Sequence, residues 1–122
     1  MNYKNIQKLI DNTDYWDARV ETLECNYFSD EIILSFKDSD CLVTYKFTEC
    51  YRVVFDHIKS YEKGRSVKDM SYSQIPYFLQ AITIGEICEQ ENTFLECKIE
   101  MFPLNVEICC KDIIVQQTPL IQ

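Results

Sequence analysis

The sequence is poor in glycine, with only Gly64 and Gly85 among its 122 residues. Loops that cradle phosphates, and the fingerprint that binds dinucleotides, each need several closely spaced glycines because the backbone must approach the phosphate groups. Two glycines this far apart in the chain build neither motif. The sequence therefore excludes these classes of nucleotide-binding enzyme.

Histidine and paired cysteines are also scarce. His57 is the one histidine, and the seven cysteines contain no Cys-x-x-C pair. Covalent catalysis needs a nucleophile held beside a base, and the sequence places no serine or cysteine next to His57. Structural zinc needs thiolates or imidazoles in closely spaced pairs. We predict a chain that is not an enzyme, with no catalytic residues, no metal site and no cofactor; a Cys–His pair is the alternative left open.

The cysteines themselves are expected to be reduced, since disulfides need an oxidising compartment and an odd number could not all pair. Most should pack as small apolar side chains. The adjacent Cys109 and Cys110 should project from opposite faces of a strand, because side chains alternate along an extended backbone.

Long apolar runs are missing as well. No segment approaches the roughly 20 apolar residues that span a bilayer. The first residues, Met1–Asp11, lack the uncharged stretch of a signal peptide. We expect a cytoplasmic protein that does not contact membranes.

Positive charge is in deficit, because 12 Lys and Arg face 20 Asp and Glu and give a net charge of −8. This charge repels the phosphates of nucleic acids, so nucleic acid is not an expected partner. Two interpretations remain. The charge keeps the protein soluble, or it forms a docking surface that speeds the approach of a basic partner.

What the chain does contain is alternating apolar residues, preceded by one short helical pattern. The segment Asn2–Ile10 has helical spacing, with Asn2 able to cap the helix. From Trp16 to Tyr27 the period becomes two, with a slip at Glu21 and Thr22 that indicates a β-bulge. We predict an N-terminal helix followed by a bulged first strand.

The later strands follow the same alternation. We predict a hairpin within 32–47 turning at Asp38–Asp40, a strand over 51–57 and a hairpin over 95–110 turning at Pro103. Its second strand is expected to extend over 113–117, past a disturbance at Lys111 and Asp112. The run 77–87 fits a helix or a strand, and its β-branched residues favour a strand. Residues 59–73 form a long exposed loop, either disordered, simply solvated or functional. The prediction is one domain, 1–122, mainly β, with an antiparallel sandwich-like sheet of about seven strands; an α+β fold is the alternative.

Aromatic residues are abundant, with eight tyrosines, seven phenylalanines and one tryptophan. Aromatic side chains are the preferred anchors of protein interfaces. Those next to turns or loops are candidates for exposed anchors: Tyr3, Tyr15, Tyr27, Tyr61 and Tyr72. Those on strand faces are expected in the core: Tyr45, Tyr51 and Phe55.

Three segments of the chain form recognisable motifs: Trp16-Asp17-Ala18-Arg19-Val20, the run from Tyr77 to Ile82, and the closing Pro103–Ile113. Together they resemble segments of small bacterial immunity-type proteins associated with polymorphic toxin systems. The resemblance implies a cytosolic protein that docks on a toxin domain and blocks it, commonly a nuclease with a basic surface. Such a family carries no catalytic residues. We expect Asp17 to have a structural role, bonding backbone amides at the start of the first strand.

The leading hypothesis is therefore an immunity protein that binds and inhibits a cognate protein toxin without covalent chemistry. The acidic turn residues are the expected contacts: Asp30, Glu31, Asp38 and Asp40. One alternative is a self-associating module, in which an exposed edge strand pairs two copies into a homodimer. Another is a small-ligand pocket or enzyme inside the β shell, with polar groups converging on His57 or a cysteine.

Overall fold

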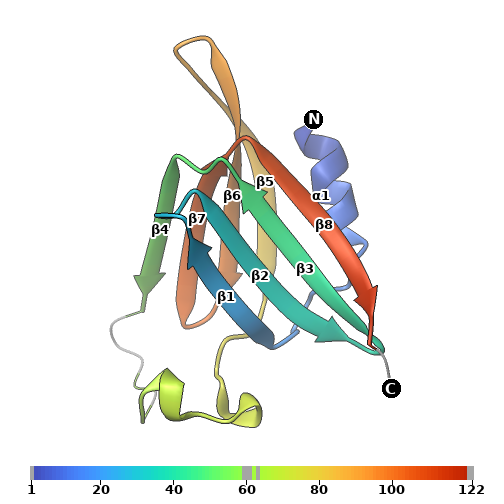
Figure 1. Ribbon diagram of the computed structural model, residues 1–122, viewed down its shortest axis with the longest axis vertical. Helices are drawn as coiled ribbons and strands as arrows, with labels where there is room; N and C mark the ends of the chain where they lie inside the picture. Colours follow the sequence, from blue (N-terminus) through green and yellow to red (C-terminus); the bar gives the residue numbers. More distant parts are fainter. Residues whose placement is uncertain (1, 59–61, 63, 121–122) are drawn as a thin grey trace.

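A computed structural model describes residues 2–58, 62 and 64–120 of the chain, which form eight strands, one α-helix and two short 3-10 helices (Figure 1). The elements in chain order are α1 (Tyr3–Asp11), β1 (Val20–Asn26), β2 (Glu31–Asp38), β3 (Cys41–Thr48), β4 (Arg52–His57), η1 (Val67–Asp69), η2 (Tyr72–Gln74), β5 (Ala81–Glu89), β6 (Asn92–Met101), β7 (Leu104–Cys110) and β8 (Asp112–Pro119).

The strands form two antiparallel sheets, with the orders β1-β2-β3-β8 and β4-β7-β6-β5. The sheets lie face to face, and α1 lies beside β8 and β5 (Figure 1). The predicted mainly β, sandwich-like antiparallel fold with an N-terminal helix is confirmed.

The core lies between the two sheets, because one face of each inner strand is apolar. On β2 and β3 the fully buried side chains alternate with less buried ones, as a half-buried strand requires. One cluster joins both sheets and α1, with these members among others: Ile6, Ile10, Leu34, Phe36, Tyr45, Phe47, Leu79, Ile99, Val106, Ile108 and Ile113.

Several local predictions are confirmed. The helix begins after Asn2, whose side-chain oxygen accepts a hydrogen bond from the Lys4 N–H. The β-bulge of β1 lies between Val20 and Thr22. The run 77–87 is a strand from Ala81 onward rather than a helix.

The prediction that the first strand opens at Trp16 is wrong, because the regular strand begins at Val20. Asp17 has a φ of +63°, which interrupts an extended backbone. Trp16 lies in the preceding turn and stacks on Tyr15, with the ring centroids 4.2 Å apart.

Two of the three segments that carry the family resemblance, 16–20 and 77–82, pair with each other. The N–H of Asp17 donates to the Leu79 carbonyl at 2.8 Å, and the N–H of Leu79 donates to the Ala18 carbonyl at 2.8 Å. The Arg19 guanidinium lies over the Phe78 ring, 4.7 Å from its centroid. The bond that Asp17 makes here comes from its backbone N–H, whereas the predicted bonding of backbone amides by its side chain stays a prediction. The paired segments join β1 of one sheet to β5 of the other.

The last strand corrects a second prediction. The chain after Lys111 does not extend β7; β8 crosses to the other sheet and pairs with β3, with Ile113 opposite Phe47. The N–H of Lys111 donates to the Thr48 carbonyl, which holds the crossing point against the end of β3. This crossover gives eight strands rather than about seven.

The edge of β5 is covered by polar side chains. The Gln7 amide of α1 donates to the Ile82 carbonyl at 2.9 Å and accepts from the Ile84 N–H at 2.6 Å. The Tyr15 hydroxyl accepts from the Ile82 N–H at 3.1 Å. These bonds occupy backbone groups with which another strand could pair.

Replacing Gln7 with alanine should expose this edge. The Ile84 N–H and the Ile82 carbonyl would lose their partners, so we expect the free energy of unfolding to fall by about 1–3 kcal/mol. We also expect more self-association, because an open edge pairs with other strands. Urea unfolding and light scattering measure the two effects. Asn5→Ala, an exposed change in the same helix, is the control; equal behaviour of the two variants would contradict the role of Gln7.

The predicted burial or exposure of the aromatic side chains is confirmed for some residues and wrong for others. Tyr45 is buried as expected, whereas Tyr51 and Phe55 are more than one-third exposed. These residues lie at or beside β4, an edge strand whose faces are incompletely covered. Tyr15, a candidate exposed anchor, is buried because its hydroxyl reaches the edge of β5.

Of the other candidate anchors, Tyr27 and Tyr72 are exposed, Tyr3 is partly buried, and Tyr61 lies outside the described residues. The predicted loop 59–73 contains η1 and the first two residues of η2, and its residues 59–61 and 63 lie outside the described part.

Candidate functional site

The four acidic residues expected to contact a partner lie in two pairs at opposite ends of β2. Asp30 and Glu31 lie where the β1–β2 turn enters β2, and Asp38 and Asp40 lie at the β2–β3 turn. A strand of this length places its ends roughly 24 Å apart. The two pairs therefore present separate acidic corners of one hairpin.

The members of these pairs differ in their freedom to meet a partner. Glu31 is held by Lys46, with Nζ 3.4 Å from Oε2, and its other oxygen accepts from Asn26. Asp30 and Asp40 are exposed, while Asp38 is partly buried. An incoming cation would meet Asp30 and Asp40 more readily than Glu31.

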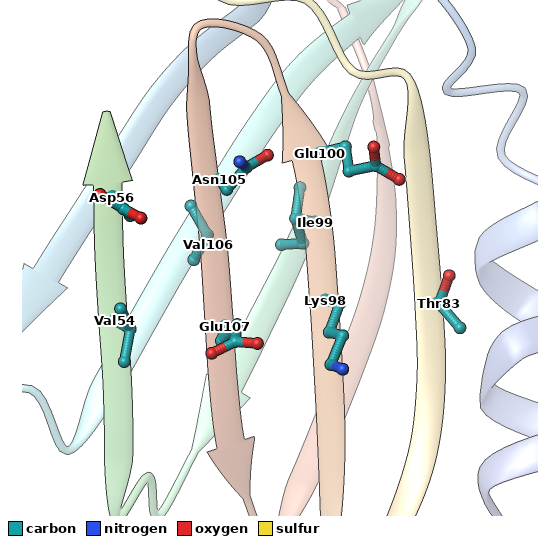
Figure 2. A pocket seen from close by; sticks show the side chains of 9 residues that line it. All are labelled: Val54, Asp56, Thr83, Lys98, Ile99, Glu100, Asn105, Val106 and Glu107. Atoms are coloured by element: carbon teal, nitrogen blue, oxygen red, sulfur yellow. The ribbon is translucent and has the colours of Figure 1, made fainter. Parts of the chain in front are cut away.

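A shallow hollow of about 470 Å³ crosses the second sheet, and Figure 2 shows its lining on β4, β7, β6 and β5. Strand register brings the polar groups into rows. Lys98 of β6 lies opposite Glu107 of β7, and Asn105 lies between Asp56 and Glu100. The rows place side chains from four strands on one surface.

The hollow is acidic in balance. Among its described lining residues, Asp56, Glu100 and Glu107 carry negative charge and Lys98 carries positive charge. Arg52, on the neighbouring row, pairs with Glu107, with Nη1 3.5 Å from Oε2. Carboxylates in such a hollow accept hydrogen bonds from lysine or arginine side chains.

A second, more apolar cleft of about 350 Å³ lies beside His57. The His57 Nε2 and the Tyr77 hydroxyl are 2.8 Å apart, so the histidine is hydrogen-bonded as an ordinary structural residue is. The other described lining residues are Val20, Glu21, Leu23, Val67, Ile75, Met101 and Leu104. None of these nine residues has a serine or threonine hydroxyl or a thiol, so no Ser–His, Thr–His or Cys–His pair is formed within this lining.

Side chains alternate between the two faces of β7, so the adjacent Cys109 and Cys110 lie on opposite faces of the sheet. Cys110 belongs to the core between the sheets, whereas Cys109 is buried outside that cluster, on the opposite face of β7. Burial in the core raises the pKa of the Cys97 thiol, because a thiolate would be poorly solvated there. Cys97 is thus held as a neutral, apolar side chain.

The family comparison covers nearly the whole chain. A family model described as immunity protein PIM7 matches residues 2–117, which include every strand and α1 apart from the last two residues of β8. The chain belongs to the PIM7 immunity protein family. Membership associates the chain with toxin neutralisation and therefore with a protein partner. No curated protein matches the PIM7 chain in a separate search.

In the part of the PIM7 chain that the structure describes, no helix has both the length and the apolar character needed to cross a bilayer.

Proposed function

We propose that this PIM7 protein neutralises a cognate toxin domain in the cytoplasm by binding it without covalent chemistry. The observation that carries the proposal is membership of an immunity protein family over residues 2–117. The proposed partner is a basic toxin domain, because the chain has a net charge of −8 and such a field favours a positively charged surface. The nuclease type is what the resemblance to immunity-type proteins implies.

The acidic turns of the β2–β3 hairpin and its neighbouring turn are the proposed contacts, namely Asp30, Glu31, Asp38 and Asp40. They lie in the turns or at the strand ends beside them, where binding residues commonly occur on a rigid scaffold. Because the two pairs lie at opposite ends of β2, one toxin domain can reach both only if its surface spans the hairpin. The pairs can therefore be tested separately.

Two double variants test these contacts, Asp30→Lys with Glu31→Lys and Asp38→Lys with Asp40→Lys. Each reversal adds two positive charges, so each double variant moves the net charge from −8 to −4. At a contacting corner the association rate with the purified toxin domain should fall about 10-fold or more, and its salt dependence should weaken. The toxin domain encoded beside the gene for this chain is the probe, with stopped-flow binding and inhibition of toxin activity as readouts.

A matched control separates local contact from total charge. Asp69→Lys with Glu86→Lys makes the same change in net charge at exposed positions outside both corners. If this control slows association as much as both test variants do, the acidic turns are not the contacts. If the parent chain neither binds the toxin domain nor inhibits it, the proposed function itself fails.

A further inference from the structure

The β1–β2 turn exposes two adjacent aromatic rings. Phe28 is fully exposed and Tyr27 is 74% exposed, the two highest values among the exposed large apolar side chains. Removing such rings from water is favourable, so two exposed rings at a turn contribute little to the stability of the fold. Exposed aromatic side chains of this kind are typical anchors of protein interfaces.

The backbone of this tip is also costly to maintain. Tyr27, Phe28 and Ser29 have φ values of +53°, +56° and +71°, the left-handed region that residues with a Cβ avoid. Glycine or asparagine would occupy these positions with less strain. Backbone strain of this kind is typical of sites that serve binding rather than folding.

The turn is nevertheless fixed in place. The Asp30 N–H donates to the Tyr27 carbonyl at 3.0 Å, and the Cys50 N–H donates to the Asp30 carbonyl at 2.9 Å. The second bond ties the tip to the connection between β3 and β4. The two rings are therefore presented by an ordered turn, which lowers the entropy that an interface would lose on binding.

A second pair of rings follows directly along this connection. Tyr51 comes after Cys50, is 43% exposed, and contacts Phe94 with ring centroids 4.3 Å apart. The Tyr51 N–H donates to the Cys109 carbonyl, which fixes it to β7. We call Tyr27, Phe28, Tyr51 and Phe94 the aromatic end of the molecule.

Acidic side chains predominate around the aromatic end. Partial desolvation, together with the Cys109 thiol and the carboxylates of Glu89 and Glu96, raises the pKa of Tyr51 to about 12. Asp30 is exposed beside the tip. Lys111 lies over the Phe94 ring at 5.9 Å and supplies a positive charge. The other flanking charges are Glu31 paired with Lys46, the exposed Glu49, and Arg52 paired with Glu107.

From these observations we propose that the Tyr27–Phe28 tip is the anchor of the toxin interface, inserting into an apolar pocket whose rim carries lysine or arginine. The exposed rings provide apolar burial, and the surrounding carboxylates provide the charge complementarity that selects a basic rim. This inference rests on the proposed function and adds to it the central contact, which the acidic turns alone do not supply.

Phe28→Ser tests the anchor against the purified toxin domain encoded beside the gene for this chain. Removing a central aromatic anchor should raise the Kd about 30-fold or more, mainly through faster dissociation. Phe28→Tyr keeps a ring and should bind within about 3-fold of the parent, since an aromatic surface remains. Leu9→Ala is the matched control, because Leu9 is 49% exposed on α1, beside the edges opposite β1 and β4.

A double variant adds a readout that a merely structural role would not give. Tyr27→Asn with Phe28→Gly relieves the left-handed strain, so its melting temperature should rise by about 4 °C or more while toxin binding is lost. A folding role for the rings predicts the opposite shift in melting temperature. A higher melting temperature together with weaker toxin binding would support the role of the tip as an anchor.

Each remaining outcome decides against one part of the proposal. Binding of Phe28→Ser within about 3-fold of the parent overturns the anchor and leaves toxin binding intact. If the parent itself does not bind the toxin domain, the proposed function and the anchor both fall. If light scattering shows a dimer that Phe28→Ser converts to a monomer, while toxin affinity is unchanged, the tip joins two copies of the chain and the inference is wrong.

Discussion

Raising the pH to about 11 should lower the free energy of unfolding by about 4 kcal/mol through two core side chains, Tyr45 and Cys97. Both are fully buried between the sheets. Burial raises the pKa of the Tyr45 phenol, although its bond to Thr13 acts in the opposite direction. Burial likewise raises the pKa of the Cys97 thiol. Tyr45 and Cys97 therefore remain protonated in the folded core at alkaline pH.

The sign follows from proton binding. The unfolded chain loses these protons near the ordinary values, 10.0 for tyrosine and 9.0 for cysteine, whereas the folded chain retains them. Above those values the folded state binds more protons than the unfolded state, so stability falls as pH rises. At about pH 11 the pH lies about two units above the pKa of the unfolded cysteine and about one unit above that of the unfolded tyrosine, and each unit lowers the free energy of unfolding by about 1.4 kcal/mol. The summed loss is a large share of the roughly 5–15 kcal/mol that is typical for the free energy of unfolding of a folded protein.

Urea unfolding at pH 7 and pH 11, with a reductant present, measures the loss. The double variant Tyr45→Phe with Cys97→Ala should be less stable at pH 7, because it loses the Tyr45–Thr13 hydrogen bond and opens a small cavity. Its further loss between the two pH values should be smaller than the parent's by about 4 kcal/mol. Tyr27→Phe with Cys25→Ala, at exposed positions, is the control. If the core variant shows the parent's full loss, buried ionisation does not cause it.

The hollow on the second sheet could be predicted from the sequence only in part. In the hairpin predicted over 95–110, side-chain alternation puts Lys98 and Glu100 on one face, and in the structure both are exposed. Their neighbours depend on the strand order β4-β7-β6-β5, which pairs segments far apart in the chain. The alternation of apolar and polar residues along one strand carries no information about the order of strands in the sheet, so the part of the hollow that contains Asp56 and Glu107 could not be predicted.

The aromatic tip shows a different limit. Tyr27 stood out in the sequence as a residue next to a turn, and its exposure agrees. Phe28 did not, because three consecutive left-handed residues without glycine are not a turn that residue preferences indicate. The alternation also suggested a core position for Phe55, but side-chain period fixes only the face of a strand. Whether that face is covered depends on the position of β4 at a sheet edge.

Ile113 and Ile114 provide the sharpest test of the one topological error, the path of the chain after β7. If β7 simply continued, its inward series Val106, Ile108 and Cys110 would place Ile114 in the core. The crossover at Lys111 shifts the phase, so Ile113 is 1% exposed and Ile114 is 39% exposed. The same substitution at two adjacent positions therefore separates the two topologies.

Ile113→Ala should lower the free energy of unfolding by about 2–4 kcal/mol, because it removes buried methyl groups opposite Phe47 and leaves a cavity. Ile114→Ala, on the outer face, should cost less than about 1 kcal/mol. Urea unfolding at neutral pH gives both values, and unchanged m-values would show that the difference lies in stability. The reverse order of the two variants would mean that the chain extends β7, and the sheet order β1-β2-β3-β8 would have to be abandoned. A larger loss for Ile113→Ala than for Ile114→Ala would instead show that β8 pairs with β3 and adds its buried face to the core shared by the two sheets.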